Sequence, residues 1–197
     1  MTVASLVRRL SVVFLCVALG ACVSTRTDTA NVDEKRALES HISLALNYIE
    51  SKNRESARHH LRRAFEIDRR SVDATFAMAM LYQLEGEPEL AEEKFKQTLR
   101  MNKNHTRARN NYGVFLFERE RYQEAYEQFE LAANDLDYDN RAQAMMSLGR
   151  TALRLGKTEK ALSTFESANR LNPGLPRLKY ELAELYFTLE DYASARR

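Results

Sequence analysis

The chain has 197 residues, with 30 Lys and Arg against 28 Asp and Glu, so its formal net charge at pH 7 is only +2. Nucleic-acid-binding domains concentrate positive charge on one face, and this balance gives no sign of such a partner. Three prolines and six glycines, among abundant Ala, Leu, Glu, Arg and Lys, favour a helical protein instead.

Residues 1–21 predict an export signal. Arg8 and Arg9 precede an apolar run, LSVVFLCVAL, that extends from Leu10 to Leu19. This is the length of a signal-peptide hydrophobic region, roughly 7–15 residues, whereas a membrane-spanning helix needs about 20 apolar residues. We therefore expect the segment to be removed on export. Both arginines leave with it, so the mature chain has 28 basic and 28 acidic residues.

The four residues Leu19-Gly20-Ala21-Cys22 resemble the lipobox of bacterial lipoproteins, in which the cysteine is acylated and becomes the first residue of the mature chain. The resemblance implies lipid attachment at Cys22, followed by a polar spacer over residues 22–36. In that family an Asp after the cysteine favours the inner membrane, so Val23 implies the outer membrane. Ordinary cleavage after Ala21, which leaves a free thiol, is the alternative. Cys16 leaves with the signal, so one mature chain can form no disulfide and no Cys-based metal site.

Residues 37–197 contain a repeat of 34–36 residues. A small residue is followed twelve positions later by the pattern Ala-x₃-(aromatic or Leu)-x₂-small. The second patterns start at Ala57, Ala91, Ala125 and Ala161, and the earlier small residues are Ala45, Ala79, Gly113 and Gly149. A fifth copy has Ala183 and Ala195. Small residues let two helix backbones approach at a crossing, and an aromatic ring fills the space beside them. The repeat therefore predicts pairs of crossing helices.

The pattern resembles the tetratricopeptide repeat, which implies an all-α fold, an α-solenoid whose helix pairs stack into a superhelix with the first helices lining a concave groove. The early Trp of the repeat is absent, and its late Pro appears only as Pro173. We expect the two extra residues of the third unit near Asp135 to Asn140, in a turn between repeats. We also expect about four and a half repeats and a truncated C-terminus, with Leu182, Leu185 and Tyr186 lacking a partner helix.

No catalytic or metal-binding constellation is found. His59 and His60 are adjacent on a helix, project about 100° apart and cannot share a metal ion. The segment Asp137-Tyr138-Asp139-Asn140 lacks the glycine and the terminal Glu of a calcium loop. We therefore expect no enzymatic activity, cofactor, metal or small-molecule substrate.

Tetratricopeptide-repeat proteins usually contact their partners through one face of each first helix. Carried over from that resemblance, the face holds Ile42, Leu46, Ile49, Phe76, Met80, Arg107, Asn110, Val114, Phe117, Met146, Arg150 and Leu153. Grooves that clamp a carboxylate have Lys, Asn and Arg where this chain has Ile42 and Leu46. A largely apolar groove suits an amphipathic helix or an extended segment better. The alternative is that these residues only pack against neighbouring first helices.

Taken together, lipobox and repeats resemble the pilotin lipoproteins of type IV pili, the PilF and PilW type. The strongest local match is NNYGVFLFERERYQEAYEQFELA, from Asn110 to Ala132. The resemblance implies a lipid-anchored protein on the periplasmic face of the outer membrane that binds the pilus secretin subunit and promotes its assembly. Two other classes stay open: a different periplasmic scaffold, such as an adaptor of barrel assembly or of proteases, and a cell-wall enzyme.

Overall fold

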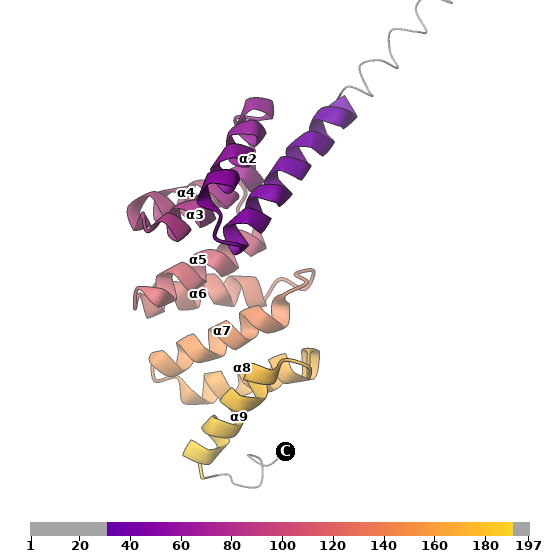
Figure 1. Ribbon diagram of the computed structural model, residues 1–197. Coiled ribbons are helices and arrows are strands. Elements are labelled where there is room, and N and C mark those ends of the chain that lie inside the picture. Colours follow the sequence, from indigo (N-terminus) through magenta and orange to yellow (C-terminus); the bar gives the residue numbers. More distant parts are fainter. Residues whose placement is uncertain (1–30, 191–197) are drawn as a thin grey trace, which may run out of the picture. The chain divides into compact units, whose positions relative to one another are not determined.

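The computed structural model describes residues 31–190, and every regular element within them is an α-helix (Figure 1). A first helix covers residues 31–50. It is followed by α2 (Arg54–Ile67), α3 (Val72–Glu85), α4 (Pro88–Met101), α5 (Thr106–Glu118), α6 (Tyr122–Ala133), α7 (Arg141–Arg154), α8 (Thr158–Leu171) and α9 (Pro176–Thr188). The expectations about residues 1–30, including Cys22, and about Ala195 lie outside the described residues.

The chain divides into two compact units at Ala77 and Met78. The first contains helix 31–50, α2 and the start of α3; the second contains the rest of α3 and the helices α4 to α9. Residues 31–36, which the sequence assigned to the spacer, are helical and continuous with helix 31–50. The helical region therefore begins before residue 37.

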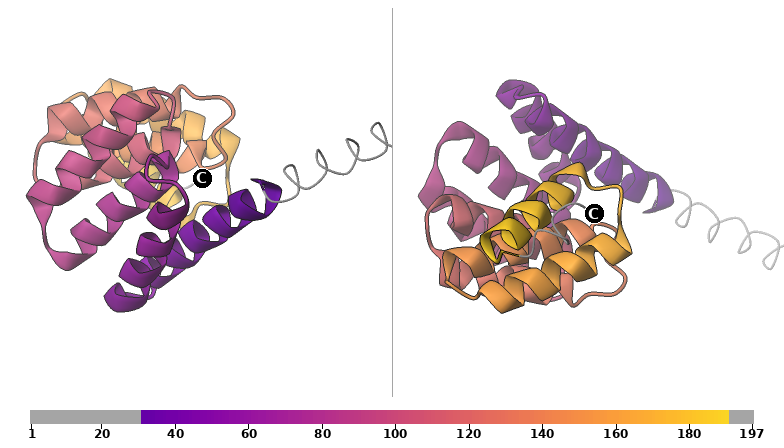
Figure 2. Two further views of the ribbon diagram at one scale, coloured as in Figure 1. Left: turned by 90° about the horizontal axis from the view of Figure 1, so that it is seen from above. Right: turned by 90° about the horizontal axis from the view of Figure 1, so that it is seen from below.

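The repeat phase is confirmed by burial. All twelve residues of the Ala-x₃-(aromatic or Leu)-x₂-small pattern in α2, α4, α6 and α8 are buried: Ala57, Leu61, Ala64, Ala91, Phe95, Thr98, Ala125, Phe129, Ala132, Ala161, Phe165 and Ala168. Ala45 and Ala79 are also fully buried, and Gly113 and Gly149 are buried. In the second unit the pairs α5–α6 and α7–α8 follow one another along the stack, with α9 next to α8 (Figures 1 and 2).

Each first helix ends in the same left-handed turn. Positive φ values occur at Lys52, Gly86, Glu120, Gly156 and Glu190, which are 34, 34, 36 and 34 residues apart. After α5, the Arg121 N–H donates to the Leu116 carbonyl at 3.1 Å and the Glu120 N–H donates to Phe117 at 3.0 Å. This Schellman-type pairing satisfies carbonyl groups that the helix end leaves open. Glycine adopts the left-handed conformation without strain, but three of the five positions are not glycine.

The turns between repeats are ordered by Asp and Asn side chains. After α2, α4 and α8, one side-chain Oδ1 atom accepts a hydrogen bond from the backbone N–H two residues later, at 2.8–3.0 Å. The accepting residues are Asp68, Asn102 and Asn172. Such Asx turns order the connection in place of the missing prolines. The connection between α6 and α7 covers residues 134–140, whereas 102–105 suffice between α4 and α5. The longer turn was predicted there and is confirmed.

The prediction that Leu182, Leu185 and Tyr186 lack a partner helix is wrong. Leu182 and Leu185 are buried, because α9 packs against α8. The Tyr186 hydroxyl donates to Glu166 Oε1 on α8 at 2.7 Å. The large apolar side chains that this region leaves exposed are instead Tyr180, Phe187 and Leu189.

Candidate partner-binding groove

Two adjoining cavities lie along the first helices α5, α7 and α9 of the second unit. Their volumes are about 230 Å³ and 430 Å³, and they share Phe117 and Arg150. The smaller is lined by Val114, Phe117, Glu118, Phe129, Ser147, Arg150 and Arg177. The larger is lined by Phe117, Arg150, Leu153, Arg154, Thr158, Glu181, Glu184, Leu185 and Thr188. We call these residues together the α5–α7–α9 groove.

The apolar part of the groove follows from helical spacing. Val114 and Phe117 are three residues apart on α5, so both face the same side of the helix. Both are only partly buried, and so is Leu153 on α7. Phe129 of α6 lines the smaller cavity while being almost fully buried. The groove therefore combines apolar side chains that a partner can reach with a wall that belongs to the core.

Phe117 is held by its neighbours. Its ring packs edge-on against Tyr122, with centroids 5.2 Å apart. The Arg150 guanidinium carbon lies 5.5 Å from the ring centroid, within the range of a cation–π contact. An aromatic ring fixed in this way loses little side-chain entropy when a partner covers it.

Charged side chains cross the groove. The Glu181 carboxylate on α9 forms ion pairs with Arg150, at 3.2 Å from Nε, and with Arg177, at 3.5 Å from Nε. Glu181 is 15% exposed, whereas Arg177 is 64% exposed. Glu181 therefore holds charge at the wall of the groove, while Arg177 reaches into solvent. An apolar surface crossed by charges of both signs is suited to an amphipathic segment.

Four of the residues predicted from sequence are brought together in this groove: Val114, Phe117, Arg150 and Leu153. Leu46, Met80 and Asn110 are partly exposed and Arg107 is exposed, but none of them lines either cavity.

The structure removes four other residues from the predicted contact face. Ile42 and Ile49 are each 8% exposed, Phe76 is 2% exposed and Met146 is 4% exposed. Their side chains are buried, so they offer a partner almost no surface. Assigning contact residues by their position in each first helix also selects side chains that pack inside the protein. Position alone does not distinguish these from the side chains that a partner can reach.

Sequence reasoning missed the contribution of α9 and the polar side of α7. Arg177, Glu181 and Glu184 come from the first helix of the fifth unit, which the repeat phase had identified. Extending the contact face to that helix would have found them. Ser147 and Arg154 of α7 had no comparable signal.

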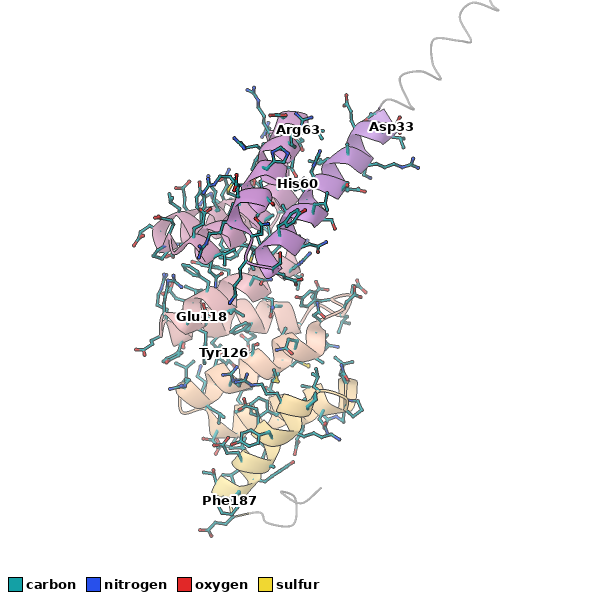
Figure 3. The ribbon with its side chains drawn as sticks, in the orientation of Figure 1. Asp33, His60, Arg63, Glu118, Tyr126 and Phe187 are labelled. Atoms are coloured by element: carbon teal, nitrogen blue, oxygen red, sulfur yellow. The ribbon has the colours of Figure 1, made fainter. Side chains whose placement is uncertain are left out.

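In the first unit, the histidines form a cluster that the sequence did not predict. Nδ1 of His41 and Nδ1 of His60 are 3.0 Å apart, so one ring donates and the other accepts. The His60 ring also stacks on Tyr48 at 5.5 Å, and Figure 3 labels His60 on α2. Burial, followed by the neighbouring His41 and His59, lowers the pKa of His60. Nowhere in residues 31–190 do three His, Cys, Asp or Glu side chains gather as metal ligands would.

An ion-pair network joins α4 to α5 and α6, outside the groove. Arg121 Nη1 donates to Glu92 at 2.7 Å, and the Tyr112 hydroxyl donates to the same carboxylate at 2.9 Å. The hydrogen bond from Arg121 is the main reason why the pKa of Glu92 falls to about 2. Burial, with Glu92 beside it, raises the pKa of Tyr112. These groups connect neighbouring helices.

Comparison with known proteins agrees with the repeat architecture. Tetratricopeptide-repeat family models match residues 38–71, 105–173 and 152–197. Helices long and apolar enough to cross a membrane are absent from residues 31–190.

The type IV pilus assembly protein PilF of Pseudomonas aeruginosa is 37% identical over 197 residues, which cover 97% of this chain and 77% of that protein. An uncharacterized protein of Haemophilus influenzae is 27% identical over 165 residues, or 84% of this chain and 91% of that protein.

Solved structures give the same relationship. The structure of Pseudomonas aeruginosa PilF matches with a TM-score of 0.79 and 37% identity, over 83% of this chain and 74% of that one. PilW, described as a widely conserved type IV pilus biogenesis factor, matches with a TM-score of 0.70 over 80% of this chain and 72% of that one, and at 24% identity it supports the fold alone. The all-α tetratricopeptide-repeat class is thus confirmed, and this chain belongs to the family of type IV pilus assembly proteins that includes PilF.

Proposed function

We propose that this protein is a pilotin: an outer-membrane lipoprotein that binds the secretin subunit of the type IV pilus and promotes its localisation and multimerisation. Its relationship to PilF supports a role in type IV pilus biogenesis. The observation that carries the binding role is the α5–α7–α9 groove, where α5 and α7 leave Val114, Phe117 and Leu153 partly accessible and α9 adds charged side chains.

The groove fits a segment with one apolar and one charged face. Apolar side chains of such a segment cover Phe117 and Leu153, and its charged side chains reach Arg150, Arg154 and Glu184. Covering a partly exposed aromatic ring such as Phe117 is the kind of contact that dominates the binding energy of protein interfaces. Helix-in-groove recognition of this sort needs no chemistry on the partner.

The anchor is the second half of the proposal. Acylation of Cys22 fixes one end of the protein to the inner face of the outer membrane, while the groove holds a secretin segment. One acyl chain holds a protein only reversibly, whereas several chains make a durable tether. Tethering raises the local concentration of secretin subunits at the membrane, which favours their assembly.

Crosslinking in intact cells tests the groove. A photo-reactive residue at Phe117 or Leu153 should capture the pilus secretin. The same residue at Ser163, which is exposed on the second helix α8, should not. Capture of a barrel-assembly or protease component from the groove positions would favour the alternative scaffold function instead.

The anchor is tested separately with Cys22→Ser. Because acylation needs the sulfur, the variant should leave the outer-membrane fraction, and unassembled secretin monomer should accumulate. Normal outer-membrane fractionation of the variant would refute the anchor.

A further inference from the structure

One segment of the first unit, around α2, carries a positive charge that the proposed function does not use. Residues 52–70 contain seven Lys and Arg and three Asp and Glu, a net charge of +4. Residues 71–190 contain 16 Lys and Arg and 19 Asp and Glu, a net charge of −3. The basic residues of the first segment, which we call the α2 basic surface, are Lys52, Arg54, Arg58, Arg62, Arg63, Arg69 and Arg70.

The fold of α2 makes this charge accessible. The buried side of α2 consists of Ala57, Leu61 and Ala64. All seven basic residues are exposed. Asp68 is occupied with the turn, because its Oδ1 accepts the backbone N–H of Arg70 at 2.8 Å.

Acidic neighbours neutralise this charge only in part. Arg63 forms an exposed ion pair with Glu66 at 2.5 Å. Among residues 31–190, no acidic side chain pairs with Arg62, Arg69 or Arg70. Positive charge therefore remains for a partner outside the unit.

The hairpin brings part of this surface to the end from which the N-terminal segment leaves. Helix 31–50 and α2 are joined by the short turn 51–53, so α2 runs back along the first helix. Figure 3 shows Arg63 and Asp33 at the same end of the hairpin. Helix 31–50 holds Asp33, Glu34, Glu39 and Glu50 against Lys35 and Arg36, a net charge of −2, which offsets only half of the +4 of residues 52–70.

The distance to the proposed anchor is short. Residue 31 follows Cys22 by nine positions, so the covalent chain between them spans at most about 30 Å. An acyl group in the bilayer therefore keeps this end of the hairpin close to the lipid headgroups. An acidic protein segment would match the charge equally well, but nothing would hold it at this end of the unit.

We propose that the α2 basic surface binds anionic phospholipid headgroups of the membrane that holds the acylated N-terminus. The choice of a membrane over another partner rests on the proposed anchor at Cys22. An arginine close to an anionic leaflet strengthens binding roughly fivefold, and the effect is screened by salt. Several such contacts add an electrostatic attachment to the lipid tether and fix which side of the first unit faces the bilayer.

The test uses the chain from residue 22 onward with Cys22→Ser, so that no acyl chain contributes. Sedimentation is measured with vesicles of phosphatidylcholine alone and with vesicles containing about one third phosphatidylglycerol. The test variant combines Arg62→Gln, Arg69→Gln and Arg70→Gln. The control combines Lys103→Gln, Arg170→Gln and Lys179→Gln, which removes the same charge from exposed positions of the second unit. Circular dichroism verifies that both variants remain folded.

We expect the parent chain to bind only the anionic vesicles, and to lose that binding at high salt. The α2 variant should bind about 100-fold more weakly at low ionic strength, and the control should lose much less. No binding to anionic vesicles, or equal loss in both variants, overturns the proposal. So does an α2 variant that binds anionic vesicles as tightly as the parent chain, because the α2 basic surface would then not be the lipid contact. The vesicle assay contains no secretin, so its failure leaves the pilotin proposal intact.

Discussion

A Cβ atom on Gly149 would lie 2.4 Å from Cε1 of Phe165, closer than real side chains approach. The same relationship joins Gly113 to Phe129, at 2.8 Å. Both phenylalanines are buried at the crossing of two helices, so their rings have little room to move. Glycine is required here for space and not for an unusual backbone conformation.

Gly149→Ala should therefore destabilise the protein by about 1–3 kcal/mol through overpacking, even though alanine favours a helix. Gly156→Ala is the matched control. An added Cβ meets nothing within 4 Å there, but φ is +71°, so the expected cost is about 1 kcal/mol of backbone strain. Urea denaturation measures both. A larger effect at Gly156 would mean that the crossing adapts easily.

Gly113→Leu should overpack the preceding crossing and destabilise by about 1–3 kcal/mol. Its side chain must displace the Phe129 ring, which is 1% exposed. Thermal unfolding followed by circular dichroism measures the change. An unchanged melting curve would contradict the assignment of Gly113 to the contact between α5 and α6.

Glu120→Gly should stabilise the protein by about 0.5–1 kcal/mol. Glu120 has φ of +59°, and glycine relieves that strain at some cost in unfolded-state entropy. Glu127→Gly, in the middle of α6, should instead destabilise by about 1 kcal/mol. Chemical denaturation measures the change in unfolding free energy of both variants. The two changes should have opposite signs if the strain comes from the turn at Glu120 and not from glutamate itself.

Stability should fall in acid because of Glu92. Its pKa is about 2 in the folded protein against 4.5 normally, chiefly through its hydrogen bond with Arg121. A lowered carboxyl pKa stabilises the folded state above pH 4.5, and this contribution is lost as the pH falls from 4.5 towards 2. Glu92→Gln should flatten the dependence of the urea midpoint on pH in that range. Glu159→Gln, which removes a carboxylate exposed in the first turn of α8, is the matched control.

Phe117→Glu should weaken secretin binding at least about tenfold while helicity stays intact, because it places a charge between the two cavities. Leu131→Glu makes the same kind of change at a 51% exposed position on the second helix α6 and should bind normally. Affinity measured with purified secretin separates the two. Normal binding by the Phe117 variant would move the contact to another surface.

The fold could be predicted because its signal is periodic. A buried Ala or Phe recurs in each second helix, and one phase accounts for Ala57, Ala91, Ala125 and Ala161. The contact face was predicted less well. Phe117 and Leu153 remain accessible while Phe76 and Met146 are buried, although all four are apolar residues on first helices. Exposure depends on which neighbouring helix covers a side chain, and a single repeat does not contain that information.

The contact between His41 and His60 illustrates the same limit. Each histidine lies on its own helix, and only the way in which helix 31–50 packs against α2 brings their rings together. The groove residues of α9 were different, because the repeat phase already marked that helix as a first helix. The sequence therefore contained the signal for these α9 residues, and extending the contact face to the fifth first helix would have identified them.

Phe129 occupies two roles at once, since its ring touches Gly113 inside the hairpin and also forms part of the wall that a guest peptide would meet. The shape offered to that peptide is thus set from behind, by residues that no partner ever contacts. Substitutions at these buried positions would therefore change the affinity for the bound peptide without changing any exposed side chain.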